Sequence, residues 1–262
     1  MQLPHIDGGK AFDWGRASQD YAQYRDIYPP QFYQTILDLG LCQNGQDILD
    51  LGTGTGVLPR GLYKHGGHWT GVDCAENQIQ HAIRLSQDRG MDIRFFVAPA
   101  EATGLPDQSF DVITACQCIP YFDKPKLVRE TVRLLRPGGH FLILYMVWLP
   151  AESEIARQSE ALVLQVNPDW SGGNMHRTPC TMPDWATSAF SCVHALGYDV
   201  DIPFTRESWH GRIIACRGIG ASSLPQSAID TFTQAHLAYL QTVPSTFTIP
   251  HYVTLLDLQV NA

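Results

Sequence analysis

Apolar positions along the chain alternate between two periods. From residue 29 onward, segments with helical spacing of Leu, Ile, Phe and Ala follow short apolar runs of the kind that form buried strands. The pattern predicts helices at 29–40, 57–67, 75–90 and 124–135, and strands at 47–52, 94–99, 110–117 and 140–148, with a further strand ending at residue 73. Regular alternation of strands and helices predicts a parallel, doubly wound α/β sheet.

The pattern changes after residue 150. A helix at 151–166 leads into NPDWSGGNMHRTPCTMPDW, whose Gly, Pro, Asn and Asp content is typical of a loop or lid. Two strand-like runs at 192–204 and 246–260, separated by helices near 205–217 and 224–242, are interpreted as the last strands of the same sheet. We therefore expect one domain over 1–262. Its parts are an N-terminal lid segment (1–30), a ligand-binding core (31–148), a cap insertion (149–190) and a C-terminal part with the last two strands and their inserted helices (191–262).

A glycine-rich turn follows the first predicted strand. In DLGTGTG, Asp50 lies at the carboxyl end of that strand and precedes Gly52, Gly54 and Gly56. Glycine permits backbone angles and close ligand approach that a Cβ would block. The spacing is G-x-G-x-G, whereas dinucleotide oxidoreductases use G-x-G-x-x-G. A carboxylate here would repel a pyrophosphate and attract an ammonium group.

A second carboxylate ends the next predicted strand, 23 residues after Asp50. Asp73 can there accept hydrogen bonds from both hydroxyls of a ribose. The two carboxylates together fit a ligand that has a ribose, carries positive charge and lacks phosphate. The alternatives are that Asp50 caps the following helix or pairs with a local cation, and that Asp73 is the N-cap of the helix beginning AENQ.

Four motifs extend this pattern in order: DILDLGTGTG, GVDCAENQI, APAEATGLPDQSFDVI and LVRETVRLLRPGGHFLI. On these motifs the chain, from about residue 21 to 148, resembles the class I S-adenosylmethionine (SAM) dependent methyltransferases, and within them the bacterial small-molecule group of methyltransferase type 11. The resemblance implies a Rossmann-like, seven-stranded, mostly parallel sheet with a helical and loop cap. It also implies SAM as cofactor and S-adenosyl-L-homocysteine as product.

The resemblance further implies a cofactor site. Asp50 and the glycine turn would lie beside the methionine moiety, Asp73 would bind the ribose, and Tyr21 with Arg25 would close over the SAM carboxylate. Beside the adenine, Pro99 stands where the family often has Asp, and after the fourth strand Pro120 and Tyr121 replace the His and Trp common among relatives. The full set of implied cofactor residues is Tyr21, Arg25, Asp50, Gly52, Thr53, Gly54, Gly56, Asp73, Gln78, Ala100, Glu101, Cys116, Gln117 and Tyr121.

The acceptor site is expected in the cap, over the carboxyl ends of the strands. An Arg there is suited to bidentate capture of a carboxylate or phosphate, which predicts a small anionic acceptor. The alternatives are that the tryptophans form core, that the histidines are structural, and that Arg206 pairs with Glu207 on the surface. The acceptor-site candidates are Trp148, Trp170, His176, Arg177, Arg206, Trp209, His210 and Arg212. No catalytic base, reactive cysteine or metal site is assigned.

The composition narrows the classes of molecule that the protein is expected to bind. A net charge of -8 leaves no uniform positive field for nucleic acid or for an anionic membrane face. The seven Cys lack paired zinc-site spacing, and no apolar run resembles an export signal or a membrane span, so a cytoplasmic location is expected. The oligomeric state stays open. Two functional alternatives also remain: an NAD(P)-dependent oxidoreductase and a SAM-binding protein without catalysis.

Overall fold

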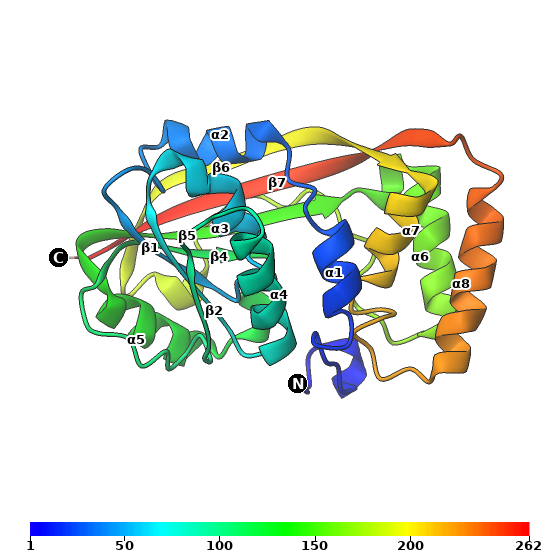
Figure 1. Cartoon of the computed structure of the whole chain (residues 1–262), viewed down its shortest axis with the longest axis horizontal. Coiled ribbons are helices and arrows are strands. Elements are labelled where there is room, and N and C mark those ends of the chain that lie inside the picture. The colour runs from blue at the N-terminus through cyan, green and yellow to red at the C-terminus, as the bar shows by residue number, and fades with distance from the viewer. Residues whose placement is uncertain (262) are drawn as a thin grey trace. The chain divides into compact units, whose positions relative to one another are not determined.

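The computed structural model describes residues 1–261 and contains one seven-stranded sheet (Figure 1). The strands are β1 (Asp47–Leu51), β2 (His68–Asp73), β3 (Arg94–Val97), β4 (Phe110–Cys116), β5 (Leu135–Trp148), β6 (Phe190–Thr205) and β7 (Thr246–Val260). The α-helices are α1 (Ser18–Tyr24), α2 (Pro30–Asp38), α3 (Val57–Leu62), α4 (Glu76–Gln87), α5 (Lys124–Leu134), α6 (Glu154–Val166), α7 (Arg206–Ile214) and α8 (Gln226–Leu240). The 3₁₀ turns are η1 (Asp7–Gly9), η2 (Tyr63–His65), η3 (Ile119–Tyr121), η4 (Pro150–Glu152) and η5 (Asp184–Ala186).

The strand order is β3-β2-β1-β4-β5-β7-β6, which confirms the predicted seven-stranded, mostly parallel α/β sheet. The central strand β1 pairs in parallel with β2 on one side and with β4 on the other. The chain proceeds from β1 outward to β3 and then returns to begin β4 on the opposite side of β1. Doubly wound sheets bind ligands at the carboxyl ends of the strands beside such a reversal.

The helices form where the apolar spacing and the end signals predict them. In α4, Ile79, Ala82 and Ser86 are buried along one face, as expected for an amphipathic helix on a sheet. Helix α2 begins with Pro30 at its first position, where the missing backbone N–H costs no hydrogen bond. Helix α5 is capped by Asp123, whose carboxylate accepts the backbone N–H of Lys126.

Strand β5 and helix α1 differ most from the elements that the sequence predicts. Strand β5 begins at Leu135 and not at residue 140, because Leu135 pairs with Phe110 before the register shifts between Phe110 and Val112. A turn-like Arg-Pro-Gly-Gly segment is therefore included in the strand. Helix α1 lies in the N-terminal segment where no helix was predicted; its seven residues are mostly polar and give no apolar period.

The described chain divides into two compact units. The cap unit comprises Met1–Ile27, Val147–Thr178 and Asp199–Tyr252, and it contains α1, α6, α7 and α8. The sheet unit comprises Tyr28–Met146, Pro179–Tyr198 and the chain from Val253 onward, and it contains β1 to β4 with α2 to α5.

Candidate cofactor and acceptor sites

The glycine turn after β1 requires its glycines. Gly52, Gly54 and Gly56 have φ values of 64°, 56° and 76°, in the left-handed region that side chains rarely adopt. A Cβ on Gly52 would lie 2.9 Å from the Cβ of Cys118, and one on Gly56 would lie 2.8 Å from the ring of Phe95. Both backbone angle and space therefore exclude larger residues from this turn. Thr53, between the first two glycines, is buried.

Asp50 is a buried carboxyl beside this turn. It is 2% exposed, and its Oδ1 accepts the hydroxyl of Thr114 at 2.6 Å. Thr114 reaches Asp50 because the two residues are register partners across the parallel pair β1 and β4. Burial raises the pKa of Asp50 to about 7, and the charge of Asp73 contributes in the same direction. Sequence reasoning missed Thr114, since no local pattern records strand register.

Asp73 ends β2 and connects the glycine turn to the start of α4. Its Oδ1 accepts the backbone N–H of Ala75 at 2.8 Å, and its Oδ2 accepts the N–H of Gly54 at 3.0 Å. Burial nevertheless raises the pKa of Asp73. The N-cap residue of α4 is Ala75, so Asp73 does not occupy the N-cap position proposed as its alternative role.

Two carboxyl groups, those of Asp50 and Asp73, are largely buried at the carboxyl ends of β1 and β2. Burial opposes the charged form of each one, and a cationic group bound beside Asp50 would relieve that cost. A pyrophosphate would add repulsion instead. The glycine turn and the acidic pair thus fit a ribose-containing cation, and they fit a dinucleotide poorly.

The residues expected around an adenine lie in the same unit. Gln78, in the first turn of α4, and Ala100, just after β3, are buried. Glu101 is half-buried, and its Oε1 accepts the backbone N–H of Asp123 at 2.8 Å, at the start of α5. Its carboxylate therefore has a structural contact in addition to the role that the resemblance implies.

The turn after β4 is fixed by neighbouring strand β5. Gln117 has a φ of 65°, donates its backbone N–H to Leu144 O at 2.8 Å, and donates its side-chain amide to Met146 O at 2.7 Å. The thiol of Cys116 and the hydroxyl of Tyr28 are 3.1 Å apart. These contacts hold Gln117 at a positive φ, which residues with a side chain rarely adopt. Tyr121 follows in η3 and is half-buried.

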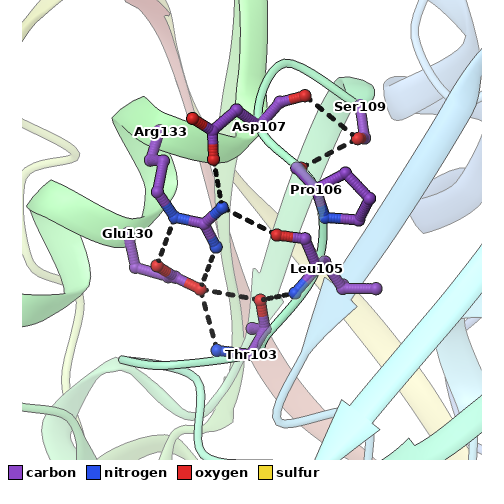
Figure 2. A network of polar contacts seen from close by, with 7 residues as sticks. All are labelled: Thr103, Leu105, Pro106, Asp107, Ser109, Glu130 and Arg133. Atoms are coloured by element: carbon purple, nitrogen blue, oxygen red, sulfur yellow. Dashed lines mark hydrogen bonds and ion pairs between the residues drawn. The ribbon is translucent and has the colours of Figure 1, made fainter.

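A polar network holds the loop that follows the adenine segment (Figure 2). Glu130 of α5 accepts the backbone N–H and the hydroxyl of Thr103 at 2.8 and 2.7 Å. Arg133 donates to both carboxylate oxygens of Glu130, at 2.9 and 2.7 Å, and to Leu105 O at 2.7 Å. The hydrogen bonds from Arg133, and after them those from Thr103, lower the pKa of Glu130 to about 2. Arg133 also pairs with Asp107.

Tyr21 and Arg25 lie in the cap unit, at α1. The Arg25 guanidinium lies 4.6 Å from the Tyr21 ring centroid, in cation–π geometry, and donates to the Tyr21 hydroxyl at 3.4 Å. Helix α1 packs on α7: a Cβ on Gly211 would lie 2.2 Å from the ring of Tyr24. Tyr21 and Arg25 therefore contact each other within the cap unit.

The three tryptophans proposed for the acceptor site are buried in the cap unit. Trp148 donates its indole N–H to Glu160 at 2.5 Å, and fully buried Trp209 donates to Ser159 at 2.9 Å. Trp170 packs against Gly172, Gly173 and Gly218. Sequence reasoning missed Glu160 and Ser159, which lie on the inner face of α6.

The polar acceptor candidates fall into two groups. His176 and Arg177 are exposed, and Arg177 forms ion pairs with Glu152 and with Asp199, the latter at 2.7 Å. Arg206 donates to Val243 O and to Gln241, both at 3.0 Å. The half-buried His210 and the 3% exposed Arg212 lie deeper.

His210 belongs to a chain of buried hydrogen bonds. Its Nδ1 lies 2.9 Å from Nδ1 of His236, and Nε2 of His236 lies 2.9 Å from the Ser159 hydroxyl. That hydroxyl also donates to Ile155 O and accepts the Trp209 indole N–H. It therefore accepts from His236, which leaves Nδ1 of His236 to accept from His210. This chain joins α6, α7 and α8 and gives His210 a structural role.

Comparison with known proteins identifies the family of the glycine-turn region. Residues 49–143 match the family model described as a methyltransferase domain. Residues 49–143 are therefore a methyltransferase domain, which supports a class I SAM-dependent methyltransferase. The matched residues contain Asp50, the glycine turn and Asp73, which confirms the family that the sequence motifs predicted.

Relatives of this methyltransferase extend the comparison. It is 33% identical over 135 residues to the uncharacterized methyltransferase YcgJ of Bacillus subtilis, over 48% of this chain and 52% of the relative. It is 37% identical over 111 residues to demethylmenaquinone methyltransferase of Thermus thermophilus, over 41% of this chain and 50% of the relative. The chain thus spans about half the length of the curated relatives it matches.

Solved structures share the fold of this methyltransferase. The crystal structure of YcgJ has a TM-score of 0.54 at 20% identity, covering 88% of this chain and 99% of that one. A Haemonchus contortus phosphoethanolamine N-methyltransferase, in complex with phosphomonomethylethanolamine and S-adenosylhomocysteine, has a TM-score of 0.54 at 19% identity, covering 93% and 57%. Within residues 1–261, no helix has the length and apolar character needed to span a membrane.

Proposed function

We propose that this methyltransferase transfers the methyl group of SAM to a small-molecule acceptor by in-line displacement. The carbon–sulfur bond of the sulfonium breaks as the acceptor atom attacks, and S-adenosyl-L-homocysteine leaves with a neutral sulfur. The observation that supports this most strongly is the buried acidic pair, Asp50 and Asp73, on the glycine turn. The sulfonium methyl is already activated, so the protein has mainly to position the acceptor and exclude water.

The proposal assigns the cofactor contacts as follows. Asp50 and the backbone of the glycine turn would bind the methionine moiety, and Asp73 would exchange its contact with the Gly54 N–H for hydrogen bonds from the ribose hydroxyls. The buried Gln78 and Ala100 would border the adenine. Arg25, stacked on Tyr21, would bind the SAM carboxylate.

A small acceptor is supported by the relatives and by charge. One relative is named for methylating demethylmenaquinone, and the Haemonchus neighbour holds phosphomonomethylethanolamine. The net charge of -8 disfavours a nucleic-acid acceptor. We further propose that residues 1–262 act as one methyltransferase domain in the cytoplasm.

The test is methyl transfer to fractionated metabolite extract, using SAM with an isotope-labelled methyl group. We expect at least one fraction to yield a labelled product together with S-adenosylhomocysteine. Asp73→Asn should lose this activity because the ribose contact is weakened, whereas Asp92→Asn, an exposed aspartate in the same unit, should retain it. Binding of S-adenosylhomocysteine without transfer to any fraction would favour a non-catalytic SAM-binding protein. Oxidation of NADH by an extract component would favour the oxidoreductase alternative.

A further inference from the structure

Within the sheet unit, the short η3 turn after β4 packs directly on the glycine turn. The residues on either side of η3 contact Gly52: a Cβ on Gly52 would lie 2.9 Å from the Cβ of Cys118 and 3.2 Å from the ring of Phe122. The Cys118 thiol also donates to Leu51 O at 3.1 Å, where β1 ends. A movement of the η3 turn would therefore change the packing along the glycine turn.

Backbone hydrogen bonds within the η3 turn are of the 3₁₀ type. The Tyr121 N–H donates to Cys118 O at 3.0 Å, and the Phe122 N–H donates to Ile119 O at 3.2 Å. The hydrogen-bond geometry of a 3₁₀ turn is poorer than that of an α-helix, and such turns are short. A fixed position of the η3 turn therefore depends on contacts from outside it.

Lys124, the first residue of α5, supplies such a contact. Its ammonium donates to Ile119 O at 2.6 Å and to Phe122 O at 2.7 Å, so one charged group bonds the first carbonyl of the turn and the carbonyl directly after it. Hydrogen bonds from a charged donor are shorter and stronger than neutral ones. Burial lowers the pKa of Lys124, and the charges of Glu101 and Asp123 oppose that shift. The ammonium thus lies among groups that favour its charged form.

The start of α5 also holds the segment that follows β3. The Asp123 N–H donates to Glu101 Oε1 at 2.8 Å, and the Asp123 carboxylate accepts the backbone N–H of Lys126 at 3.1 Å. Glu101 directly follows the buried Ala100, which the proposed function assigns to the adenine. Residues 123–124 therefore connect α5 to two segments of the proposed cofactor site, residues 100–101 and residues 117–122.

The place of Lys124 on its helix favours a role in the turn. The helix macrodipole disfavours a cation in the first turn of a helix, so the stability of α5 itself does not explain this charge. We propose that Lys124 is a positioning residue: its ammonium fixes the η3 turn against the glycine turn and thereby raises the affinity for the SAM-type ligand. It acts through the turn and not by contact with the ligand. This inference rests on the proposed function for the identity of the ligand.

The experiment measures by calorimetry how tightly the full chain binds S-adenosylhomocysteine. Lys124→Met keeps an unbranched side chain and removes the charged donor, so the dissociation constant should rise at least about tenfold as the turn loses two charge-assisted hydrogen bonds. Lys126→Met is the matched control: it removes the same charge two residues further along α5, from an exposed ion pair with Asp123. Its dissociation constant should stay within about twofold of the unmodified protein's.

Three further readouts separate a positioning role from a purely structural one. Lys124→Arg can still donate to carbonyl oxygens, so it should recover part of the affinity that Lys124→Met loses. With an extract fraction that gives labelled product, Lys124→Met should raise the KM for SAM more than it lowers kcat. Hydrogen exchange of residues 117–123 should be faster in Lys124→Met than in Lys126→Met, and S-adenosylhomocysteine should slow it in the unmodified protein.

Two outcomes would overturn the inference: equal affinity of Lys124→Met and Lys126→Met for S-adenosylhomocysteine, or exchange of residues 117–123 that does not respond to this ligand in the unmodified protein. The second outcome needs no variant, so it decides the question even if Lys124→Met fails to fold. Failure of the unmodified protein to bind S-adenosylhomocysteine would instead contradict the proposed function. Exchange of residues 117–123 in the two variants would then still decide whether Lys124 fixes the turn.

Discussion

The residue that most strongly constrains the cofactor chemistry is Asp50. Its carboxyl is buried against Thr114, and burial raises its pKa to about 7. A folded-state pKa above the unfolded value means that ionising Asp50 costs stability as pH rises from about 4 towards 7. A positive ligand group can recover part of that cost, which links cofactor binding to pH.

We therefore expect S-adenosylhomocysteine to bind more tightly as pH rises from 6 to 8. Below pH 7 its ammonium group must displace a proton from Asp50, so affinity should fall by up to about tenfold per pH unit there. Calorimetry in buffers of different ionisation enthalpy would measure both affinity and proton release. Asp50→Asn should bind weakly and without this pH dependence. A flat profile with no proton release in the unmodified protein would remove Asp50 from the ligand site.

At the scale of elements, the Glu130 and Arg133 pair joins α5 to the loop at 103–109 (Figure 2). Arg133 first, and Thr103 after it, lower the pKa of Glu130 to about 2. Because this folded-state pKa lies below the unfolded value, the stabilisation is complete above about pH 4.5 and is lost as pH falls towards 2. The loop directly follows Ala100 and Glu101 in the chain. We therefore expect a disordered loop to disturb the position of these two proposed cofactor residues.

Glu130→Gln should lower the free energy of unfolding by about 3 kcal/mol at pH 7, since it removes the charge that Arg133 and Thr103 hold. It should also flatten the loss of stability between pH 4.5 and 2. Urea unfolding across that pH range measures both effects. The matched control is Glu154→Gln, an exposed glutamate with the same three-residue spacing to Arg157, which should cost under about 1 kcal/mol. Equal losses in the two variants would contradict this account of the network.

At the scale of elements, some features of the site could be predicted from the sequence and others could not. The glycine turn and Asp73 were predictable because strand ends, glycine spacing and an acidic residue are local features of the chain. Thr114 was not, because its contact with Asp50 depends on the register of β1 and β4. The buried position of Trp209 likewise depends on how α7 contacts α6. A tryptophan of the core and a tryptophan that lines a pocket cannot be told apart in a sequence.

On the scale of the whole molecule, the parallel, doubly wound sheet followed from the alternation of strands and helices. The composition of the cap unit did not, because it draws on three separate stretches of chain, including α1, whose polar sequence gave no helical signal.

The central claim is that the acidic pair and the glycine turn bind a SAM-type ligand and not a dinucleotide. Titration calorimetry of the full chain with S-adenosylhomocysteine, NADH and NADPH tests it most directly. The account predicts saturable binding of S-adenosylhomocysteine alone, weakened at least about tenfold by Asp73→Asn, because charge-assisted hydrogen bonds each contribute roughly 1.5 to 3 kcal/mol. Binding of NADH or NADPH with no binding of S-adenosylhomocysteine would contradict it.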